Sequence, residues 1–206
     1  MTRPDPDRTQ TEPRPNPAAS GHPLDGAGGE MTAAEPPTEP GGVTSIDDLL
    51  VRNQETAISH PYWMGPIPRL ALAMVLCMDA RVDAHAAFRI EPGEVHLVRN
   101  AGGVVTDDVI RSLAISQHAL GTREVMVVHH TDCGLARLEE DTFRARLADY
   151  AGYRPTWAVQ AFRDPHDSVR ESLRRIRDSP FLIHTHAVRG FVFDVASGLL
   201  EEVFAD

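Results

Sequence analysis

Short apolar runs separated by longer amphipathic segments constrain the fold of this chain most strongly. Residues 70–77 are almost continuously apolar, which is typical of a strand buried on both faces of a parallel sheet. Residues 95–98 and 124–128 predict two further strands. Between them, Thr106 and two aspartates predict the start of a helix that runs to Leu120, with Gly121 at its carboxyl-terminal cap. Strands that alternate with helices indicate an α/β fold with a mainly parallel sheet flanked by helices.

The remaining elements extend this pattern on both sides. Ser45 and Asp48 form a capping-box-like signal for a helix over residues 45–59. Polar segments at 136–150 and 166–178 are expected to be helical. Residues 191–195 and 199–203 predict a closing β-hairpin at one edge of the sheet.

The first 42 residues differ in composition from the rest of the chain. They hold 9 of the 16 prolines and 6 of the 15 glycines, and no aromatic residue. Such a segment cannot bury enough surface to offset its ordering entropy. We therefore expect a disordered Pro/Gly-rich tail over 1–42, more readily a solvated extension than a binding segment, and one folded domain over 43–206. Met31 is a second candidate for the start of translation.

Charge and cysteine content exclude several classes of protein. The 206 residues carry 30 acidic and 20 basic side chains, a net charge of −10, which argues against a nucleic-acid partner. No apolar run approaches the roughly 18–20 residues that span a bilayer, and no signal-peptide core is visible, so we expect no membrane partner and a cytoplasmic location. Two cysteines cannot make a disulfide framework and instead favour a metal or a reaction.

Both cysteines follow predicted strands. Cys77 ends the first strand, and His130 and Cys133 form an H-x-x-C pair just after the third. Ligands in open α/β sheets gather at the carboxyl ends of strands, so the three side chains can meet. Two thiolates and one imidazole would leave tetrahedral Zn²⁺ with one open position, as in catalytic zinc sites. The alternative is that the cysteines are small buried hydrophobes and the H-x-x-C spacing is accidental.

A carboxylate and a guanidinium stand directly after Cys77. Arg81 can keep Asp79 ionised, and Asp79 can then accept a hydrogen bond from a metal-bound hydroxide. A surface ion pair is the alternative for an isolated D-x-R sequence, but the position behind a buried strand favours a catalytic dyad.

These residues together resemble the β-class carbonic anhydrases, and most closely the short prokaryotic subgroup. The resemblance covers essentially all of residues 45–205. It is carried by Cys77-x-Asp79-x-Arg81, Arg99-Asn-Ala-Gly-Gly103, Ser112-Leu-Ala-Ile-Ser116 and His130-Thr-Asp-Cys-Gly134.

The resemblance implies a zinc-dependent lyase that reversibly hydrates carbon dioxide to bicarbonate and a proton. Cys77, His130 and Cys133 would bind one Zn²⁺ per subunit, whose hydroxide attacks the substrate while Asp79 and Arg81 orient it. In some family members the residue equivalent to Asp79 becomes the fourth zinc ligand at low pH, so Asp79 is expected in both roles. The family also implies a homodimer or a multiple of dimers, with the amino-terminal helix against the partner.

The neighbouring residues are assigned in the same way. The family spacing selects His130 over His129, since adjacent side chains in extended backbone point to opposite sides. Gly102 and Gly103 are expected to let the backbone approach the substrate cavity, or to form a simple tight turn. Gly134 would open the following helix, with its N–H near the metal.

The other histidines carry less information. His184 and His186 are expected in a loop or an edge strand, and Trp157 in packing or an interface. Proton-shuttle candidates that the sequence cannot rank are His85, His96, His118 and His166.

Two other functions compete with carbon dioxide hydration. An enzyme of the same fold could hydrolyse carbonyl sulfide or carbon disulfide, which are linear molecules like carbon dioxide. The absence of an apolar extension after the last strand disfavours this alternative weakly. A non-catalytic zinc-binding or redox-sensing protein would not need Asp79 and Arg81, which are both present.

Overall fold

The computed structural model describes residues 44–56 and 65–205. The chain divides into two units after His60, so that residues 44–56 belong to the first unit and residues 65–205 to the second. The predicted tail over 1–42, and residues 57–59 of the predicted first helix, lie outside the described residues.

In the first unit, the described part is the single helix α1 (Ser45–Thr56). The helix begins at Ser45 as predicted, but its capping pair lies one residue earlier than the sequence pattern indicated. Thr44 and Asp47 form the capping pair: the Thr44 hydroxyl accepts the Asp47 N–H, and the Asp47 carboxylate accepts the Thr44 N–H. The prediction that Ser45 and Asp48 form this pair is therefore wrong, and Asp48 instead pairs with Arg52 one turn later.

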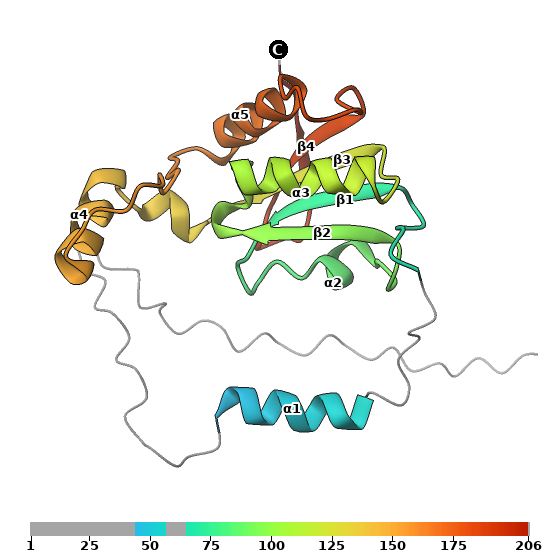
Figure 1. The fold of residues 1–206 in the computed structure, drawn as a ribbon, viewed down its shortest axis with the longest axis horizontal. Coiled ribbons are helices and arrows are strands. Elements are labelled where there is room, and N and C mark those ends of the chain that lie inside the picture. Colours follow the sequence, from blue (N-terminus) through green and yellow to red (C-terminus); the bar gives the residue numbers. More distant parts are fainter. Residues whose placement is uncertain (1–43, 57–64, 206) are drawn as a thin grey trace, which may run out of the picture. The chain divides into compact units, whose positions relative to one another are not determined.

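The second unit is built on one five-stranded sheet with the order β2-β1-β3-β4-β5. β1, β2, β3 and β4 are mutually parallel, and β5 closes the sheet as the antiparallel partner of β4. This confirms the predicted mainly parallel α/β fold with a hairpin at one edge (Figure 1). The strands are β1 (Leu72–Cys77), β2 (Val95–Asn100), β3 (Glu124–His130), β4 (Val188–Phe193) and β5 (Leu200–Val203).

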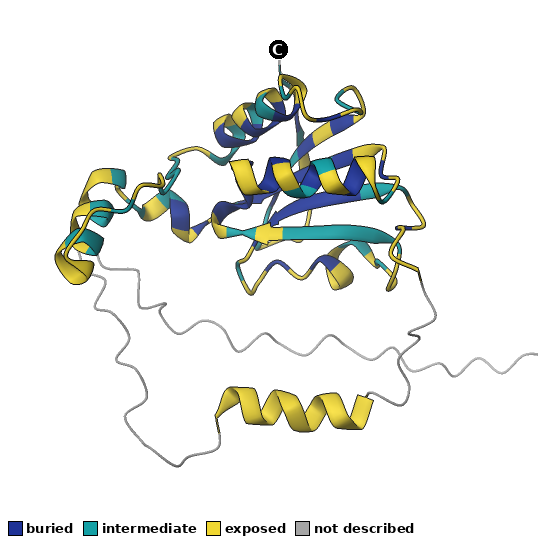
Figure 2. Ribbon diagram, viewed as in Figure 1, coloured by how far each residue is buried: buried dark blue, intermediate teal, exposed yellow. Residues whose placement is uncertain are grey.

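Helices cover the two faces of the sheet unequally. α3 (Asp107–His118) and α5 (Pro165–Arg177) share one core with the side chains of one sheet face, among them Ala73 and Val75. Met74 and Leu76 point to the opposite face, where they pack with residues of the short helix α2 (Ala84–Phe88). Because both faces of the central strands are covered, β1 and β3 are buried along nearly their whole length (Figure 2).

The ends of the strands differ from the predicted ends. β1 begins at Leu72 rather than residue 70 because Ala71 has a φ of 50°, outside the strand region. β3 continues two residues beyond the predicted end at 128, so that His130 is paired with Phe193 of β4. This extension places a candidate ligand on a rigid strand rather than in a loop.

The helical predictions also need correction. The segment predicted as one helix over 136–150 is a 3₁₀ turn, η3 (Gly134–Arg137), followed by α4 (Glu140–Ala151). The break arises because the Glu139 carboxylate accepts the Thr142 N–H and starts a new helix. The sequence pattern did not indicate α2, and α3 ends at His118 instead of Leu120. In the described ranges, no helix is long and apolar enough to cross a bilayer.

Candidate metal centre and active site

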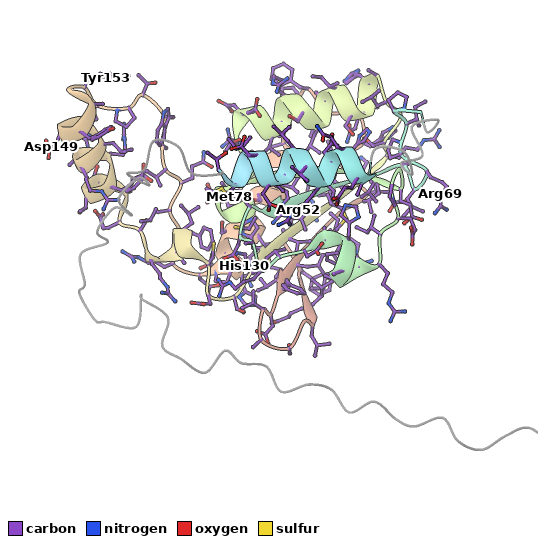
Figure 3. The ribbon with its side chains drawn as sticks, turned by 90° about the horizontal axis from the view of Figure 1, so that it is seen from below. Arg52, Arg69, Met78, His130, Asp149 and Tyr153 are labelled. Atoms are coloured by element: carbon purple, nitrogen blue, oxygen red, sulfur yellow. The ribbon has the colours of Figure 1, made fainter. Side chains whose placement is uncertain are left out.

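Three side chains that can bind a metal meet at the carboxyl ends of β1 and β3. Cys77 is the last residue of β1, His130 is the last residue of β3, and Cys133 precedes η3. One ligand atom from each residue lies within 4.8 Å of the others, and the two sulfur atoms are 3.9 Å apart. All three residues are buried, and Figure 3 marks the position of His130. The fold therefore brings together the three residues that the sequence singled out.

The imidazole of His130 is oriented so that one nitrogen is free to bind. Its Nδ1 lies 2.8 Å from the Thr131 carbonyl oxygen, which can only accept, so Nδ1 carries the proton and donates it. Nε2 is then an acceptor, yet it is buried without a hydrogen-bond partner in the described part of the chain. A buried unpaired acceptor is costly, and a metal ion would satisfy it.

The two thiols influence each other's ionisation. The contact with Cys133 lowers the pKa of Cys77 to about 4, and the same contact raises the pKa of Cys133. The pair therefore loses one proton readily, whereas loss of the second requires a positive charge nearby. A cation bound between the sulfur atoms supplies that charge.

The carboxylate of Asp79 lies at the edge of this group and is held by Arg81. The Arg81 guanidinium donates two parallel hydrogen bonds to Asp79, with Nε 3.0 Å from Oδ1 and Nη2 2.8 Å from Oδ2. These bonds lower the pKa of Asp79 to about 2, so the carboxylate is ionised at neutral pH. Asp79 Oδ2 is 3.8 Å from the unpaired Nε2 of His130. An acceptor of fixed charge thus faces the place where a metal would bind.

Comparisons with known proteins agree with this geometry. The family model described as carbonic anhydrase matches residues 72–157. The β-carbonic anhydrase 1 of Mycobacterium tuberculosis is 49% identical over 164 residues, which are 78% of this chain and 99% of that relative. The chain belongs to the β-carbonic anhydrase family.

Two further similarities show how broad this family is. A crystal structure of the carbonic anhydrase from Streptococcus mutans superposes with a TM-score of 0.73 at 34% identity, covering 78% of this chain and 98% of that chain. The carbon disulfide hydrolase of an Acidianus species is 30% identical over 183 residues, 76% of this chain and 88% of that relative. The sequence pattern of the β-carbonic anhydrase family therefore occurs in proteins named for two different activities.

The two glycines after β2 pack closely against the end of the site, Gly103 against the backbone of Cys77 and Gly102 against the side chain of Leu135. Both have positive φ values, 76° for Gly102 and 70° for Gly103, in the turn η2 (Ala101–Gly103). A Cβ atom on Gly103 would lie 2.8 Å from the Cys77 nitrogen, and one on Gly102 would lie 2.5 Å from Leu135 Cδ2. Both glycines therefore lie in a tight turn, which was one of the two expectations, and the close contacts of this turn are with Cys77 and Leu135. Gly134 differs, because a Cβ atom there would meet nothing within 4 Å, and because this glycine opens a 3₁₀ turn rather than an α-helix.

His129 belongs to the support of the site in this β-carbonic anhydrase fold. Its Nε2 lies 3.1 Å from the Gly103 carbonyl, and its ring stacks on Phe162 with centroids 5.6 Å apart. Burial lowers the pKa of His129 to about 4, so the ring is neutral and Nε2 donates to the carbonyl. The described group of potential metal ligands includes His130 and does not include His129.

Two charged residues at the site were not singled out from the sequence. Arg99 donates from Nε to the Cys77 carbonyl at 3.0 Å and from Nη2 to the Asp79 carbonyl at 2.8 Å. Asp132 accepts two hydrogen bonds from Arg81. Both residues lie inside the motifs Arg99–Gly103 and His130–Gly134. Their charge and their position beside the ends of strands are the sequence features that could have identified them.

The other histidines that the sequence analysis named lie apart from this group of ligands. His184 and His186 lie in the loop before β4, as expected. The four shuttle candidates bind elsewhere: His85 to the Ile90 carbonyl, His96 to Ser116 and the Pro66 carbonyl, His118 to the Phe181 carbonyl, and His166 to Asp164 and Glu201.

Proposed function

We propose that this chain is a carbonic anhydrase that reversibly hydrates carbon dioxide to bicarbonate and a proton, with one zinc ion bound per subunit. The observation that carries the proposal is the position of the Asp79 carboxylate, held by Arg81, 3.8 Å from the unpaired nitrogen of His130. The 49% identity to a β-carbonic anhydrase over most of the chain supports the same reaction. A non-catalytic zinc or redox sensor would not account for this carboxylate.

Cys77, His130 and Cys133 are the proposed zinc ligands. Zinc–sulfur bonds of about 2.3 Å at a tetrahedral angle require sulfur atoms roughly 3.8 Å apart. The observed separation of 3.9 Å fits this requirement, and thiolate and imidazole are the ligands that zinc prefers. Zinc held by these residues would lower the pKa of a coordinated water from about 15.7 toward 7 and so would supply a nucleophile at neutral pH.

Asp79 has the role of orienting that nucleophile. Because Arg81 keeps its carboxylate ionised, Asp79 can only accept a hydrogen bond. Asp79 would therefore orient a hydroxide beside it by accepting its proton, which would leave a lone pair of the hydroxide free to face the substrate. Asp79 Oδ2 is also 3.8 Å from Nε2 of the proposed ligand His130, which supports the second proposed role of Asp79 as a zinc ligand in a resting state.

Gly102, Gly103 and Gly134 are proposed to contribute to the substrate cavity. Gly103 keeps η2 in contact with the end of β1, next to Cys77. Gly134 directly follows Cys133 and leaves open space where any other residue would carry a side chain. A small linear substrate needs such space beside the metal.

Stopped-flow measurement of carbon dioxide hydration on zinc-loaded protein tests the proposal. We expect turnover that is lost on chelation and restored by one equivalent of zinc. Carbon disulfide hydrolysis is the second candidate, because the Acidianus relative and this chain are similar over 88% of that relative. Carbonyl sulfide and carbon disulfide are therefore assayed on the same sample. Turnover of either sulfur compound without carbon dioxide hydration would contradict the proposal.

The proposed catalytic domain spans residues 43–206 and is proposed to act as a homodimer or a dimer-based oligomer. The apolar residues Ile46, Leu49 and Leu50 of α1 are 56–70% exposed, which supports a role in binding a second copy. Sedimentation of a monomer at micromolar concentration would contradict the dimer. The cytoplasm is the proposed location. Both cysteines are free thiols, and a reducing compartment such as the cytoplasm keeps thiols in that state.

A further inference from the structure

In the sequence, Asp132 stands between the proposed zinc ligands His130 and Cys133, and its side chain contacts Arg81. Its φ of 56° is in the left-handed region, which aspartate tolerates better than most residues. Both its oxygen-bearing groups contact Arg81: the carboxylate Oδ2 accepts from Nη1 at 2.7 Å, and the main-chain carbonyl accepts from Nη2 at 2.9 Å. The other carboxylate oxygen, Oδ1, pairs with Arg137 of η3.

The guanidinium of Arg81 is thereby held on two sides. Nε and Nη2 donate to Asp79, while Nη1 and Nη2 donate to Asp132, which engages four of the five N–H groups of an arginine. Planar bidentate contacts of this kind fix orientation as well as distance.

The contact between Asp79 and Arg81 cannot by itself place the pair against the metal group. These residues are two positions apart on one loop, and Asp79 also accepts the Arg81 backbone N–H at 2.9 Å. The two side chains could therefore move as a unit without breaking any of their own bonds, since Arg99 holds only the main-chain carbonyl of Asp79. Asp132 is different, because it belongs to the segment that joins His130, the last residue of β3, to Cys133.

Stability does not account for this arrangement well. Side chains of Arg81, Asp132 and Arg137 are 38–44% exposed, and exposed ion pairs contribute about 0–1 kcal/mol. Their arrangement has a larger consequence for geometry, because displacement of a catalytic group by about 1 Å can cost 10²-fold in rate.

We propose that Asp132 is a positioning residue that locks Arg81, and through it Asp79, in place relative to Cys77, His130 and Cys133. The inference rests on the proposed function for its kinetic consequence and on the contacts alone for its structural consequence.

Asp132→Gly is the principal variant, because glycine adopts the left-handed backbone without strain and removes only the carboxylate. We expect kcat for carbon dioxide hydration to fall about ten- to a hundredfold with one zinc per chain retained. Asp132→Asn keeps an oxygen that can accept from Arg81 and is expected to recover most of the lost rate. Asp167→Asn, which disturbs the exposed pair of Asp167 with Arg170 on α5, is the matched control and is expected to leave kcat unchanged.

A double-mutant cycle separates positioning from general damage. If Asp132 acts through Asp79, adding Asp132→Gly to an Asp79→Ala background should change the residual kcat by less than about twofold. An undiminished additional loss in that background would overturn the proposal, and so would wild-type kcat in Asp132→Gly. Should Asp132→Gly not fold, the same cycle is run with Asp132→Ala, which also removes the carboxylate.

A crystal structure of zinc-loaded Asp132→Gly supplies a readout besides activity. We expect the separation of Asp79 Oδ2 from His130 Nε2 to differ from the wild-type separation by more than coordinate error, or the Arg81 side chain to be disordered. Wild-type positions of both side chains would overturn the proposal. If the wild-type protein hydrates no carbon dioxide, the proposed function fails while this structural comparison still decides the role of Asp132.

Discussion

The sulfur atoms of Cys77 and Cys133 lie 3.9 Å apart although 56 positions separate the two residues in the chain. The parallel pairing of β1 with β3 produces this proximity, because it aligns the carboxyl ends of both strands. Most of the chemistry expected of this protein depends on that relationship.

Metal removal should expose these thiols to oxidation. Without zinc, the two sulfur atoms need to approach by roughly 2 Å to form a disulfide bond of about 2.05 Å. We expect diamide to oxidise the chelated protein, taking two electrons and two protons from the thiol pair. Intact-mass measurement should then show a loss of about 2 Da and no capacity to bind zinc until a dithiol reductant is added. The zinc-loaded protein is the control and should resist the same treatment, so equal oxidation of both forms would argue against these cysteines as ligands.

Loss of the Asp79 carboxylate should abolish catalysis without loss of metal. Asp79→Ala removes the acceptor that orients the nucleophile, and we expect kcat to fall at least about 10²-fold. Zinc content should stay near one per chain, because Asp79 is not among the three residues that form the buried group. Stopped-flow kinetics and metal analysis on the same preparation check this. Near-wild-type turnover in Asp79→Ala would remove the dyad from the mechanism.

Substitution by alanine should destabilise the protein at Gly103 but not at Gly134. In Gly103→Ala, the new Cβ would lie 2.8 Å from the Cys77 nitrogen and 3.1 Å from the Val128 oxygen, at a φ of 70°. These contacts involve backbone, which cannot rotate away, so we expect a loss of about 2–5 kcal/mol in the free energy of unfolding or failure to fold. Gly134→Ala is the matched control, since nothing lies within 4 Å of its Cβ position, and its urea midpoint should be close to wild type. A Gly103→Ala protein with a wild-type urea midpoint would contradict the packing described for η2.

A histidine at the start of α5 should make stability depend on pH. Burial lowers the pKa of His166, but its contacts with Glu201 and Asp164 outweigh this and raise it overall. Because the folded pKa lies above the unfolded value of about 6.5, this contribution is fully present below pH 6.5 and is lost as the pH rises through the folded pKa.

We therefore expect His166→Gln to lower the free energy of unfolding at pH 5.5 and to have a smaller effect at pH 8.5. The difference should stay below about 1 kcal/mol, since Glu201 and Asp164 are more than half exposed. Urea denaturation at the two pH values measures it. An effect that is larger at the higher pH would reverse the sign and refute the assignment.

Much of the fold follows from local pattern. Apolar runs at 70–77, 95–98 and 124–128 mark three strands correctly to within two residues, since burial on both faces of a sheet requires such runs. Boundaries set by single side-chain contacts were less predictable. Thr44 rather than Ser45 caps α1, and Glu139 interrupts the segment predicted as one helix, because competing capping residues stand side by side in the chain.

The candidate site divides in the same way. By itself, the sequence determined which residues could hold a metal and which could ionise: Cys77, Asp79, Arg81, His130 and Cys133 stand at strand ends in recognisable spacing. Only the tertiary structure decided that the sulfur atoms face each other, that Nε2 of His130 is unpaired, and that Asp132 reaches Arg81. The reason is physical: spacing along a chain reports the type and local direction of side chains, whereas contacts between residues tens of positions apart depend on strand register and on how loops close above the sheet.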